Sequence, residues 1–599
     1  MGTQSRMGTV IETQEGTRYR IWTASVRAAG AASGKTLFDR DILKELEAMG
    51  SDPEAIREAF YRDLTFGTGG LRGILGAGTA RMNVYTVAKA SQGLADYIKD
   101  ARPARSTAAP AAIWADGPVS PPAIAISYDS RINSLLFAQT AAAVFAANGL
   151  TALLYPRLMP TPCLSFAVSR LGCAAGVMVT ASHNPASYNG YKVYGPDGCQ
   201  ITTGTAAQIQ AAIKKLDIFS DVAWIPFEDG VAQGLIRYIP EDVITDFVEA
   251  VKAQSLLEAH TPVRKDLSIV YSPLNGAGLE PVLRVLKESG YRDITVVKEQ
   301  AQPDGTFPTC PYPNPEESKV MALGLCYARA CQADLLLATD PDCDRVGIAA
   351  KGSDGRYVLL SANETGLLLL DYIASRRTAM GTMPKDPLLF KTIVTTDLAR
   401  SVAAHYGMET VDVLTGFKFI GEQIGLLEAA GALDRYVFGF EESYGYLSGT
   451  YVRDKDGVGA TFLICEMAAF YAAKGISLPE KLEALYRTYG YCLDTQHPYT
   501  FAGAAGAERM GQIMGRLREG IGQVGPRRVL SCTDYRKGID GLPAADVLRF
   551  RLDEDCSLVV RPSGTEPKIK VYISVRAKDR ETAKKIEKEL AAGLSELFR

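Results

Sequence analysis

An acidic loop gives the strongest chemical signal in the sequence. Asp340, Asp342 and Asp344 alternate with other residues in TDPDCDR, directly after an apolar run. On extended backbone, alternate side chains point to the same side, so the three carboxylates would repel one another without a cation between them. Hard oxygen ligands suit Mg²⁺ or Ca²⁺, but an EF-hand would need glycine and glutamate where this chain has Arg345 and Lys351. The loop predicts a divalent-metal site, with a solvated acidic turn as the alternative.

A second polar loop follows another apolar run, in GVMVTASHNP, and contains Ser182. A serine hydrolase would place its nucleophile in a Gly-x-Ser-x-Gly turn, but Ala181 and His183 flank this serine. From this motif alone, a helix cap or a turn serine remains the alternative. A serine that carries a phosphoryl group needs a metal to neutralise about two negative charges. The two loops together therefore predict phosphoryl chemistry.

Three further motifs suit an anionic polyol. Arg561 begins RPSGTEPKIK, where a planar guanidinium, hydroxyls and a flexible glycine would form a phosphate cradle. Arg72 is the functional candidate in the glycine-rich FGTGGLRG, and Glu441 with Ser443 in GFEESYG could accept and share hydrogen bonds with sugar hydroxyls. The alternatives are a polar turn for the Arg561 motif, a plain glycine turn for the Arg72 motif and a capping box for the Glu441 motif.

The elements that must position these loops alternate along the chain. Helical patterns such as Leu136–Ala147, Pro281–Ser289 and Glu364–Ser375 separate short apolar runs, which predicts α/β architecture with mostly parallel sheets. Because ligands bind beyond the carboxyl ends of such strands, we expect the polar loops to line one cleft among domains. The predicted strands are Ala123–Ser127, Gly176–Thr180, Ser268–Tyr271, Ile294–Val297, Leu335–Ala338, Leu388–Thr392, Tyr436–Phe440 and Leu558–Val560.

The ends of the chain and one internal segment differ from this pattern. Residues 1–35 have weak periodicity and are expected to be loosely held, with patterning from Leu37 onward. Residues 102–123, rich in alanine and proline, predict a surface insertion. The last predicted helix, Asp579–Phe598, follows a few strands, which indicates a smaller α+β domain.

Bulk composition excludes several classes of protein. A chain of 599 residues is long enough for about three to five domains. A net charge of -3 without a basic patch predicts no nucleic-acid partner, and no apolar run is long enough to predict a membrane partner. The 11 scattered cysteines form no Cys-x-x-Cys pair, so a reducing cytoplasm is the expected compartment. Nothing in the sequence implies an obligate protein partner.

Taken together, the motifs resemble the α-D-phosphohexomutase superfamily of phosphoglucomutases and phosphomannomutases. The resemblance includes TASHNP with the following NGYK, TDPDCDR, GFEESYG and RPSGTEPKIK, in family order over roughly residues 55–575. FGTGGLRG and VRDKDG are most similar to the branch of bacterial α-phosphoglucomutases and animal phosphopentomutases. The implied fold is three related α/β domains and a C-terminal α+β domain, of the TATA-binding-protein-like type, around a central cleft. The expected boundaries are an N-terminal extension at 1–36 and domains at 37–225, 226–350, 351–485 and 486–599.

The resemblance also implies roles for individual residues. Ser182 matches the phosphoserine, and a phosphoserine oxygen would complete a Mg²⁺ site with Asp340, Asp342 and Asp344. Lys192 and Lys455 are the candidates for proton transfer, with Arg345 beside the metal loop also assigned to catalysis. The residues expected to contact substrate are Arg72, Arg131, His183, Thr415, Glu441, Ser443, Arg561, Ser563, Gly564 and Thr565.

The implied activity is that of a phosphosugar mutase. The expected reaction is the interconversion of glucose 1-phosphate and glucose 6-phosphate through phospho-Ser182, with glucose 1,6-bisphosphate as intermediate and activator. Mannose or pentose phosphate specificity and glucose 1,6-bisphosphate synthesis stay open as alternatives within the family. A Mg²⁺-dependent phosphatase and a phosphosugar-binding regulator are the alternatives outside it.

Overall fold

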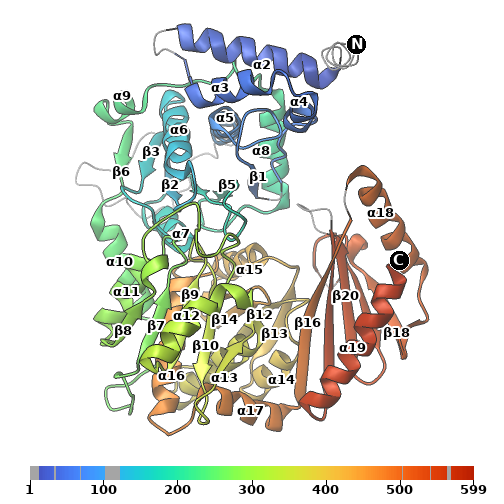
Figure 1. Ribbon diagram of the computed structural model, residues 1–599. Helices are drawn as coiled ribbons and strands as arrows, with labels where there is room; N and C mark the ends of the chain where they lie inside the picture. The colour runs from blue at the N-terminus through green and yellow to red at the C-terminus, as the bar shows by residue number, and fades with distance from the viewer. Residues whose placement is uncertain are drawn as a thin grey trace.

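The computed structural model describes residues 13–32, 36–67, 69–100, 122–501, 503–539, 541–562 and 568–598. Four sheets organise the chain into successive domains (Figure 1). The first domain lies at the top of the view, the second and third lie below it, and the fourth stands to the right. Among the described residues, no helix combines the length and apolar character needed to cross a membrane.

The first sheet has six strands in the order β1-β5-β4-β2-β3-β6. Strands β2, β3, β4 and β6 run parallel, whereas β5 returns antiparallel to β4 and pairs with β1. Every residue of β2, β3 and β4 is buried, which explains their continuous apolar sequences. The elements are β1 (Gly70–Ile74), α5 (Val84–Asp100), β2 (Ala123–Tyr128), α6 (Ser134–Ala147), β3 (Thr151–Leu154), α7 (Thr161–Arg170), β4 (Ala175–Val179), β5 (Tyr188–Tyr194), α8 (Thr203–Lys215), α9 (Phe227–Ala232) and β6 (Ile236–Tyr238).

The second sheet repeats this plan with five strands in the order β11-β10-β9-β7-β8. Strands β7, β8 and β9 are parallel, and β10 returns antiparallel to β9. Its elements are α10 (Glu241–Lys252), β7 (Ile269–Ser272), α11 (Leu279–Glu288), β8 (Ile294–Val296), α12 (Ser318–Cys331), β9 (Leu335–Thr339), β10 (Val346–Lys351) and β11 (Tyr357–Leu360).

The third sheet has the order β13-β12-β14-β15, with β12 parallel to both neighbours and β15 antiparallel to β14. In each of the first three sheets, therefore, a parallel strand leads through a short loop into an antiparallel return strand. Its elements are α13 (Ala362–Ala379), β12 (Leu388–Thr392), α14 (Leu398–His405), β13 (Glu409–Val413), α15 (Lys418–Ala429), β14 (Tyr436–Glu441), β15 (Gly445–Ser448), α16 (Gly457–Ala472) and α17 (Leu478–Tyr489).

The fourth sheet differs because all its pairings are antiparallel, in the order β16-β21-β20-β19-β18-β17. Helix α19 packs against β16 and β21, which gives the predicted α+β domain. The architecture of three α/β domains and one α+β domain is thus confirmed. Its elements are β16 (Tyr491–Thr500), α18 (Gly503–Glu519), β17 (Gln523–Val524), β18 (Arg527–Asp534), β19 (Leu548–Leu552), β20 (Cys556–Pro562), β21 (Lys568–Ala577) and α19 (Arg580–Leu597).

The expectation of a loosely held N-terminus is wrong for α2 (Gln14–Ala31), which packs with α3 (Arg40–Met49) and α4 (Pro53–Phe60) over the first domain. Trp22 is 3% exposed, and its ring meets Phe60 edge-on at 5.8 Å and Tyr85 at 5.6 Å. Few positions of α2 are buried, so its sequence lacks a clear apolar period although one aromatic side chain anchors it.

Two predicted domain boundaries fall before the end of a sheet. Strand β6 pairs with β3 beyond residue 225, and β11 pairs with β10 beyond residue 350. The predicted 102–123 insertion lies outside the described residues except at its last two positions.

Candidate active site

The first return loop, between β4 and β5, holds Ser182 in a left-handed conformation with φ of 52°. The side chain is almost completely buried. Its backbone N–H donates to Thr180 Oγ1 at 2.7 Å, and that hydroxyl donates to Asp129 Oδ2 at 2.6 Å. A non-glycine residue at positive φ stores strain that its surroundings must balance. These hydrogen bonds therefore contribute to fixing the serine in its unusual conformation.

Arg131 provides further support from beneath this loop. Its guanidinium donates to the main-chain carbonyls of Ser182, Asn184, Pro185 and Tyr188. The side chain is buried, pairs with buried Asp129 at 3.5 Å, and lies 5.0 Å from the Phe307 ring centroid. Burial lowers the pKa of Arg131 to about 10, which still leaves it charged at neutral pH. These contacts position the serine loop, and the contact of Arg131 with substrate stays a prediction.

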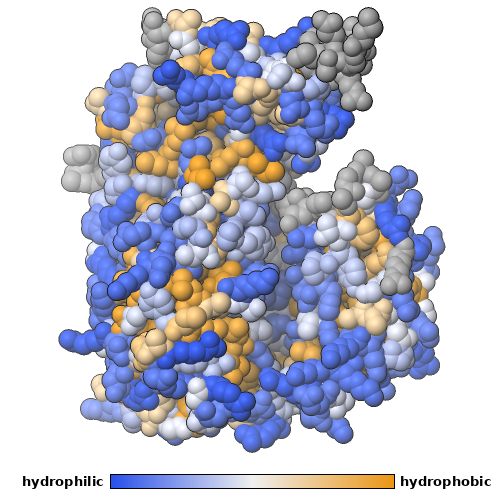
Figure 2. Space-filling view, in the orientation of Figure 1, coloured by the Kyte–Doolittle hydropathy of each residue, from blue (hydrophilic) through white to orange (hydrophobic). Residues whose placement is uncertain are grey.

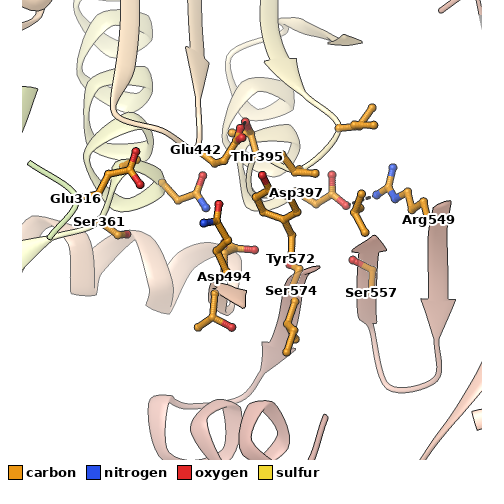
Figure 3. A pocket seen from close by; sticks show the side chains of 18 of the residues that line it. Glu316, Ser361, Thr395, Asp397, Glu442, Asp494, Arg549, Ser557, Tyr572 and Ser574 are labelled. Carbon is orange, nitrogen blue, oxygen red and sulfur yellow. Dashed lines mark hydrogen bonds and ion pairs between the residues drawn. The ribbon is translucent and has the colours of Figure 1, made fainter. Parts of the chain in front are cut away.

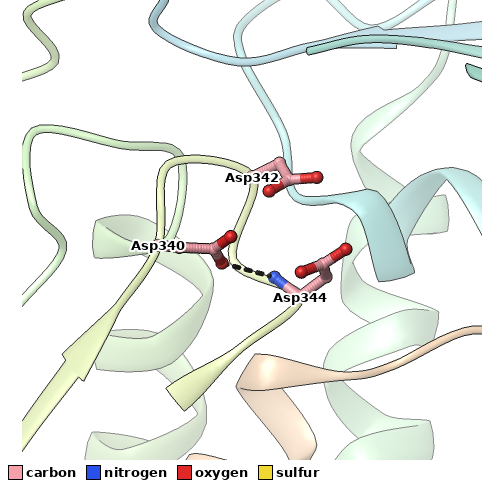
Figure 4. A group of neighbouring side chains, drawn as sticks. All are labelled: Asp340, Asp342 and Asp344. Carbon is pink, nitrogen blue, oxygen red and sulfur yellow. Dashed lines mark hydrogen bonds between the residues drawn. The ribbon is translucent and has the colours of Figure 1, made fainter. Parts of the chain in front are cut away.

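The second return loop, between β9 and β10, brings the three aspartates to one point (Figure 4). Asp340 Oδ1 accepts from the backbone N–H groups of Asp344, at 3.2 Å, and Arg345, at 3.1 Å. Asp340 Oδ2 accepts from Ser182 Oγ at 2.7 Å, across 158 residues of sequence. The structure therefore joins the two loops that the sequence singled out first.

Two lysines complete this centre. Lys192, on β5, places Nζ 2.7 Å from Asp342 Oδ2, and Lys455, from the third domain, places Nζ 3.1 Å from Asp344 Oδ2. Burial opposes charge on both lysines, but the neighbouring carboxylates outweigh it and raise the pKa of each. Both ammonium groups are therefore charged at neutral pH and able to donate a proton.

The carboxylates have the properties of metal ligands. One oxygen from each of the three carboxylates lies within 4.8 Å of the other two. Asp342 and Asp344 each keep a buried Oδ1 that has no hydrogen-bond partner among the described residues, although buried polar atoms normally have one. Burial and the other two carboxylates raise the pKa of Asp340 well above its usual value, which is the repulsion that a bound cation would relieve. The donor set fits a hard divalent cation such as Mg²⁺.

One histidine and two arginines also lie near the serine. His183 Nδ1 lies 3.2 Å from Ser182 Oγ, and burial together with Arg345 and Arg72 lowers the pKa of this imidazole well below its usual value. Arg345 forms an ion pair with Glu316 at 2.5 Å, and Arg72 donates to Asn184 Oδ1 at 3.3 Å. His183 is therefore neutral at pH 7.

The third return loop, between β14 and β15, contains the predicted sugar-binding residues. Glu441 is buried, and Ser443 Oγ donates to its Oε1 at 2.7 Å. Burial raises the pKa of Glu441 to about 7, although the Lys455 ammonium opposes the shift. The three return loops thus contribute the serine, the aspartates and the acid–hydroxyl pair from the same position in three sheets.

The predicted distal phosphate site lies between the third and fourth domains. Arg561, on β20, donates through Nη1 to the hydroxyl of Thr415, so two predicted residues from different domains are in contact. Burial and Arg561 lower the pKa of neighbouring Lys570. Ser563, Gly564 and Thr565 lie outside the described residues.

A cavity of about 260 Å³ separates the third and fourth domains near this site (Figure 3). Both polar side chains, such as Glu442 and Asp494, and apolar side chains, such as Val394, line it. Arg549 crosses the boundary to pair with Asp397 at 2.6 Å. Figure 2 also shows the surface hollowed between the first and fourth domains. The fourth domain therefore meets the third across a boundary that combines polar contacts with a small apolar cluster, in which Val394 packs with Val559 and Tyr572.

Sequence reasoning missed two residues at the centre. Thr161, at the start of α7, donates its backbone N–H to the carbonyl of Asp342 and its hydroxyl to Asp342 Oδ2, both at 2.9 Å. No motif marks this threonine. Glu316, the partner of Arg345, stands in PNPEE, a segment that resembles the family and could have suggested it.

Comparison with known proteins places the chain among phosphosugar enzymes. Four families match in order, described as phosphoglucomutase/phosphomannomutase α/β/α domains I, II and III and C-terminal domain, at residues 63–218, 245–353, 361–489 and 536–593. A phosphoglucomutase of Staphylococcus saprophyticus is 34% identical over 531 residues, covering 86% of this chain and 91% of the relative. A phosphoglucomutase of Staphylococcus aureus strain USA300 is 34% identical over 548 residues, covering 89% of this chain and 93% of the relative.

Solved structures show the same fold at lower sequence identity. The phosphoglucomutase pp63/parafusin of Paramecium, in its open form, has a TM-score of 0.65 at 17% identity and covers 90% of this chain and 95% of its own. A phosphoglucomutase/phosphomannomutase family protein of Burkholderia thailandensis has a TM-score of 0.63 at 17% identity. The match covers 89% of this chain and 97% of that protein.

Proposed function

The chain belongs to the phosphoglucomutase/phosphomannomutase family, and we propose that it interconverts glucose 1-phosphate and glucose 6-phosphate. It is a phosphosugar mutase, an intramolecular phosphotransferase. The observation that carries the assignment of Ser182 as the phosphoryl carrier is its hydrogen bond to the buried aspartate cluster. The choice of glucose is supported by the relatives that are 34% identical and named phosphoglucomutase.

Asp340, Asp342 and Asp344 would hold Mg²⁺ together with an oxygen of phospho-Ser182. When bound, the ion would supply positive charge to the phosphoryl group. Lys192, Lys455 and Arg345 surround the same point and add charge from the chain itself. Phosphoryl transfer needs little beyond alignment and such electrostatic support.

The proposed reaction consists of two transfers through glucose 1,6-bisphosphate. In the first, the bond between phosphorus and Ser182 Oγ breaks and a bond to a sugar oxygen forms. The sugar hydroxyl loses a proton and Ser182 Oγ gains one. In the second transfer, the phosphoryl group at the other end of the sugar returns to Ser182 Oγ, which loses its proton. A charged Lys192 or Lys455 is placed to protonate the departing sugar oxygen.

Other residues would bind and shield the sugar. Glu441 and Ser443 would accept and donate hydrogen bonds to its hydroxyls, and Arg561 with Thr415 would hold the phosphate that is not being transferred. One fixed phosphate site would serve both orientations of the bisphosphate. The burial of Ser182 limits access of water, which would otherwise hydrolyse the phosphoserine.

The test combines intact mass with a coupled assay of glucose 1-phosphate, mannose 1-phosphate and ribose 1-phosphate. We expect one added phosphate on the wild-type protein, lost on incubation with the preferred sugar, and fastest turnover with glucose 1-phosphate. Ser182→Ala should lack both the phosphate and turnover. The control Ser169→Ala, at an exposed serine of the same domain, should keep both.

Three results would contradict parts of this proposal. Turnover of Ser182→Ala at the wild-type rate would exclude Ser182 as the carrier. Faster turnover of mannose or ribose phosphate would overturn the choice of glucose alone. Steady release of inorganic phosphate without a bisphosphate primer would instead identify a phosphatase.

A further inference from the structure

Strand β5 presents two polar side chains to the centre, because residues two apart share one face of a strand. Lys192 reaches Asp342, as described above. Tyr194, two residues on, donates its hydroxyl to Asp454 Oδ2 at 2.8 Å, in the third domain and 260 residues away in sequence. Both Tyr194 and Asp454 are almost completely buried. The first and third domains thus meet at a buried hydrogen bond beside the phosphoryl-transfer centre.

The other oxygen of Asp454 faces Lys455. Asp454 Oδ1 accepts from the Lys455 backbone N–H at 2.8 Å and lies 3.4 Å from its Nζ. A buried carboxylate is tolerated only when its oxygens are hydrogen-bonded. With Tyr194 on one oxygen and Lys455 on the other, the carboxylate has one favoured orientation. The hydrogen bond from the neutral Tyr194 hydroxyl also weakens the attraction of the carboxylate for the Lys455 ammonium.

The Lys455 side chain has little freedom along its length. A Cβ added at Gly445 would lie 2.2 Å from Lys455 Cδ, so the stem passes directly over the glycine of the sugar loop. The Phe417 ring centroid lies 5.9 Å from Nζ. The confined ammonium therefore lies between two carboxylates, 3.1 Å from Asp344 Oδ2 and 3.4 Å from Asp454 Oδ1.

We propose that Tyr194 and Asp454 form a positioning dyad that holds the Lys455 ammonium at the phosphoryl-transfer centre. Because Tyr194 and Asp454 belong to different domains, the position of this ammonium would depend on the docking of the first domain against the third. Without the tyrosine hydroxyl, the unpaired oxygen of Asp454 would draw the ammonium away from Asp344. This inference rests on the proposed function, in which Lys455 exchanges a proton with the sugar oxygen.

The test compares two tyrosines of the same strand in the full-length protein. Tyr194→Phe removes the hydroxyl on Asp454, whereas Tyr191→Phe removes an equally buried hydroxyl that pairs with Ser91 Oγ at 2.9 Å inside the first domain. For Tyr194→Phe we expect kcat to fall about tenfold, with KM changed less than about twofold, as for loss of an interaction made in the transition state. The solvent deuterium isotope effect on single-turnover phosphoryl transfer should rise, because proton transfer becomes slower. Tyr191→Phe should leave all three quantities at wild-type values.

Two outcomes would overturn the dyad: wild-type kcat and isotope effect in Tyr194→Phe, or equal losses in both tyrosine variants. If Tyr194→Phe fails to fold, Asp454→Asn keeps the side-chain volume but removes the charge that holds the ammonium from its second side, so kcat should also fall; normal kcat there would also overturn the dyad. Failure of the proposed function is seen separately, because the wild-type protein would then not interconvert the glucose phosphates at all.

Discussion

Replacing Arg131 tests whether the serine loop depends on a guanidinium beneath it. In Arg131→Lys the charge is retained, but three donors on a flexible stem replace a planar fork with five. The Arg131 guanidinium donates hydrogen bonds to four main-chain carbonyls and pairs with Asp129. All these contacts are buried or partly buried. The lysine would lose at least two of the hydrogen bonds and leave their acceptors without partners.

The structure sets the size of the expected effect. A buried acceptor left unsatisfied costs about 1–3 kcal/mol, so the two lost in Arg131→Lys should destabilise the first domain by about 2–6 kcal/mol. Arg131→Met also leaves Asp129 as an unpaired buried charge, which costs about 3–5 kcal/mol for that interaction alone. Ser182 at φ of 52° would be free to relax. Since a shift of about 1 Å at a reacting atom costs about a hundredfold in rate, kcat of Arg131→Lys should fall by about that factor.

Urea denaturation followed by tryptophan fluorescence measures the stability of this domain. Trp22 and Trp224, the tryptophans within the described residues, both lie in or beside the first domain, and Trp22 is buried in its core. The matched control is Arg170→Lys, on the surface of the same domain, where a partly exposed pair with Asp246 contributes about 0–1 kcal/mol. The reasoning is refuted if Arg131→Lys unfolds like wild type and has normal kcat. A raised KM in that variant would instead restore the sequence-based prediction of a substrate contact.

Four further predictions concern the metal, the distal phosphate, the sugar and the N-terminus. Asp342→Asn should abolish the dependence of activity on Mg²⁺ together with most of kcat, and an unchanged metal titration would exclude it as a ligand. Arg561→Ala should raise KM about 10–100-fold through loss of a charge-assisted hydrogen bond of about 1.5–3 kcal/mol, with a smaller change in kcat; an unchanged KM would argue against phosphate binding. Because the pKa of Glu441 is raised to about 7, its carboxylate is protonated below that pH; KM should therefore rise as pH falls from 8 to 6, and Glu441→Gln should remove this dependence. Trp22→Ala should lower the free energy of unfolding of the first domain by about 3–5 kcal/mol, measured by urea denaturation followed by far-UV circular dichroism because the variant lacks the buried fluorophore, whereas no change would mean that α2 is not part of the folded domain.

The sequence predicted best those features that follow from local patterns. Polar loops after apolar strands marked Ser182 and the three aspartates, because each loop leaves a parallel strand at the same edge of its sheet. The strand from Leu335 was visible as a continuous apolar run, because every one of its residues is buried. The helix ending near Phe598 was visible in its periodicity, because it buries one face.

What the sequence could not predict depends on how domains and loops dock. Arg131 was expected to face substrate, and its contacts with backbone carbonyls could not be predicted, because every residue type has such a carbonyl. The contact of Tyr194 with Asp454 spans 260 residues and forms only when two domains meet. Helix α2 escaped notice because one tryptophan anchors it rather than an apolar stripe.

The assembly of the centre from three return loops also has a consequence for synthesis of the chain. Ser182 leaves the ribosome first, the aspartates follow, and Lys455 comes last. At about 5–20 residues per second, roughly 14–55 seconds pass between Ser182 and Lys455. During that interval the first domain can fold around Trp22 while its serine lacks first the carboxylates and then, until the end, the second ammonium. The nascent protein therefore has no competent phosphoryl-transfer site, and the serine cannot be loaded and wastefully hydrolysed before the third domain emerges.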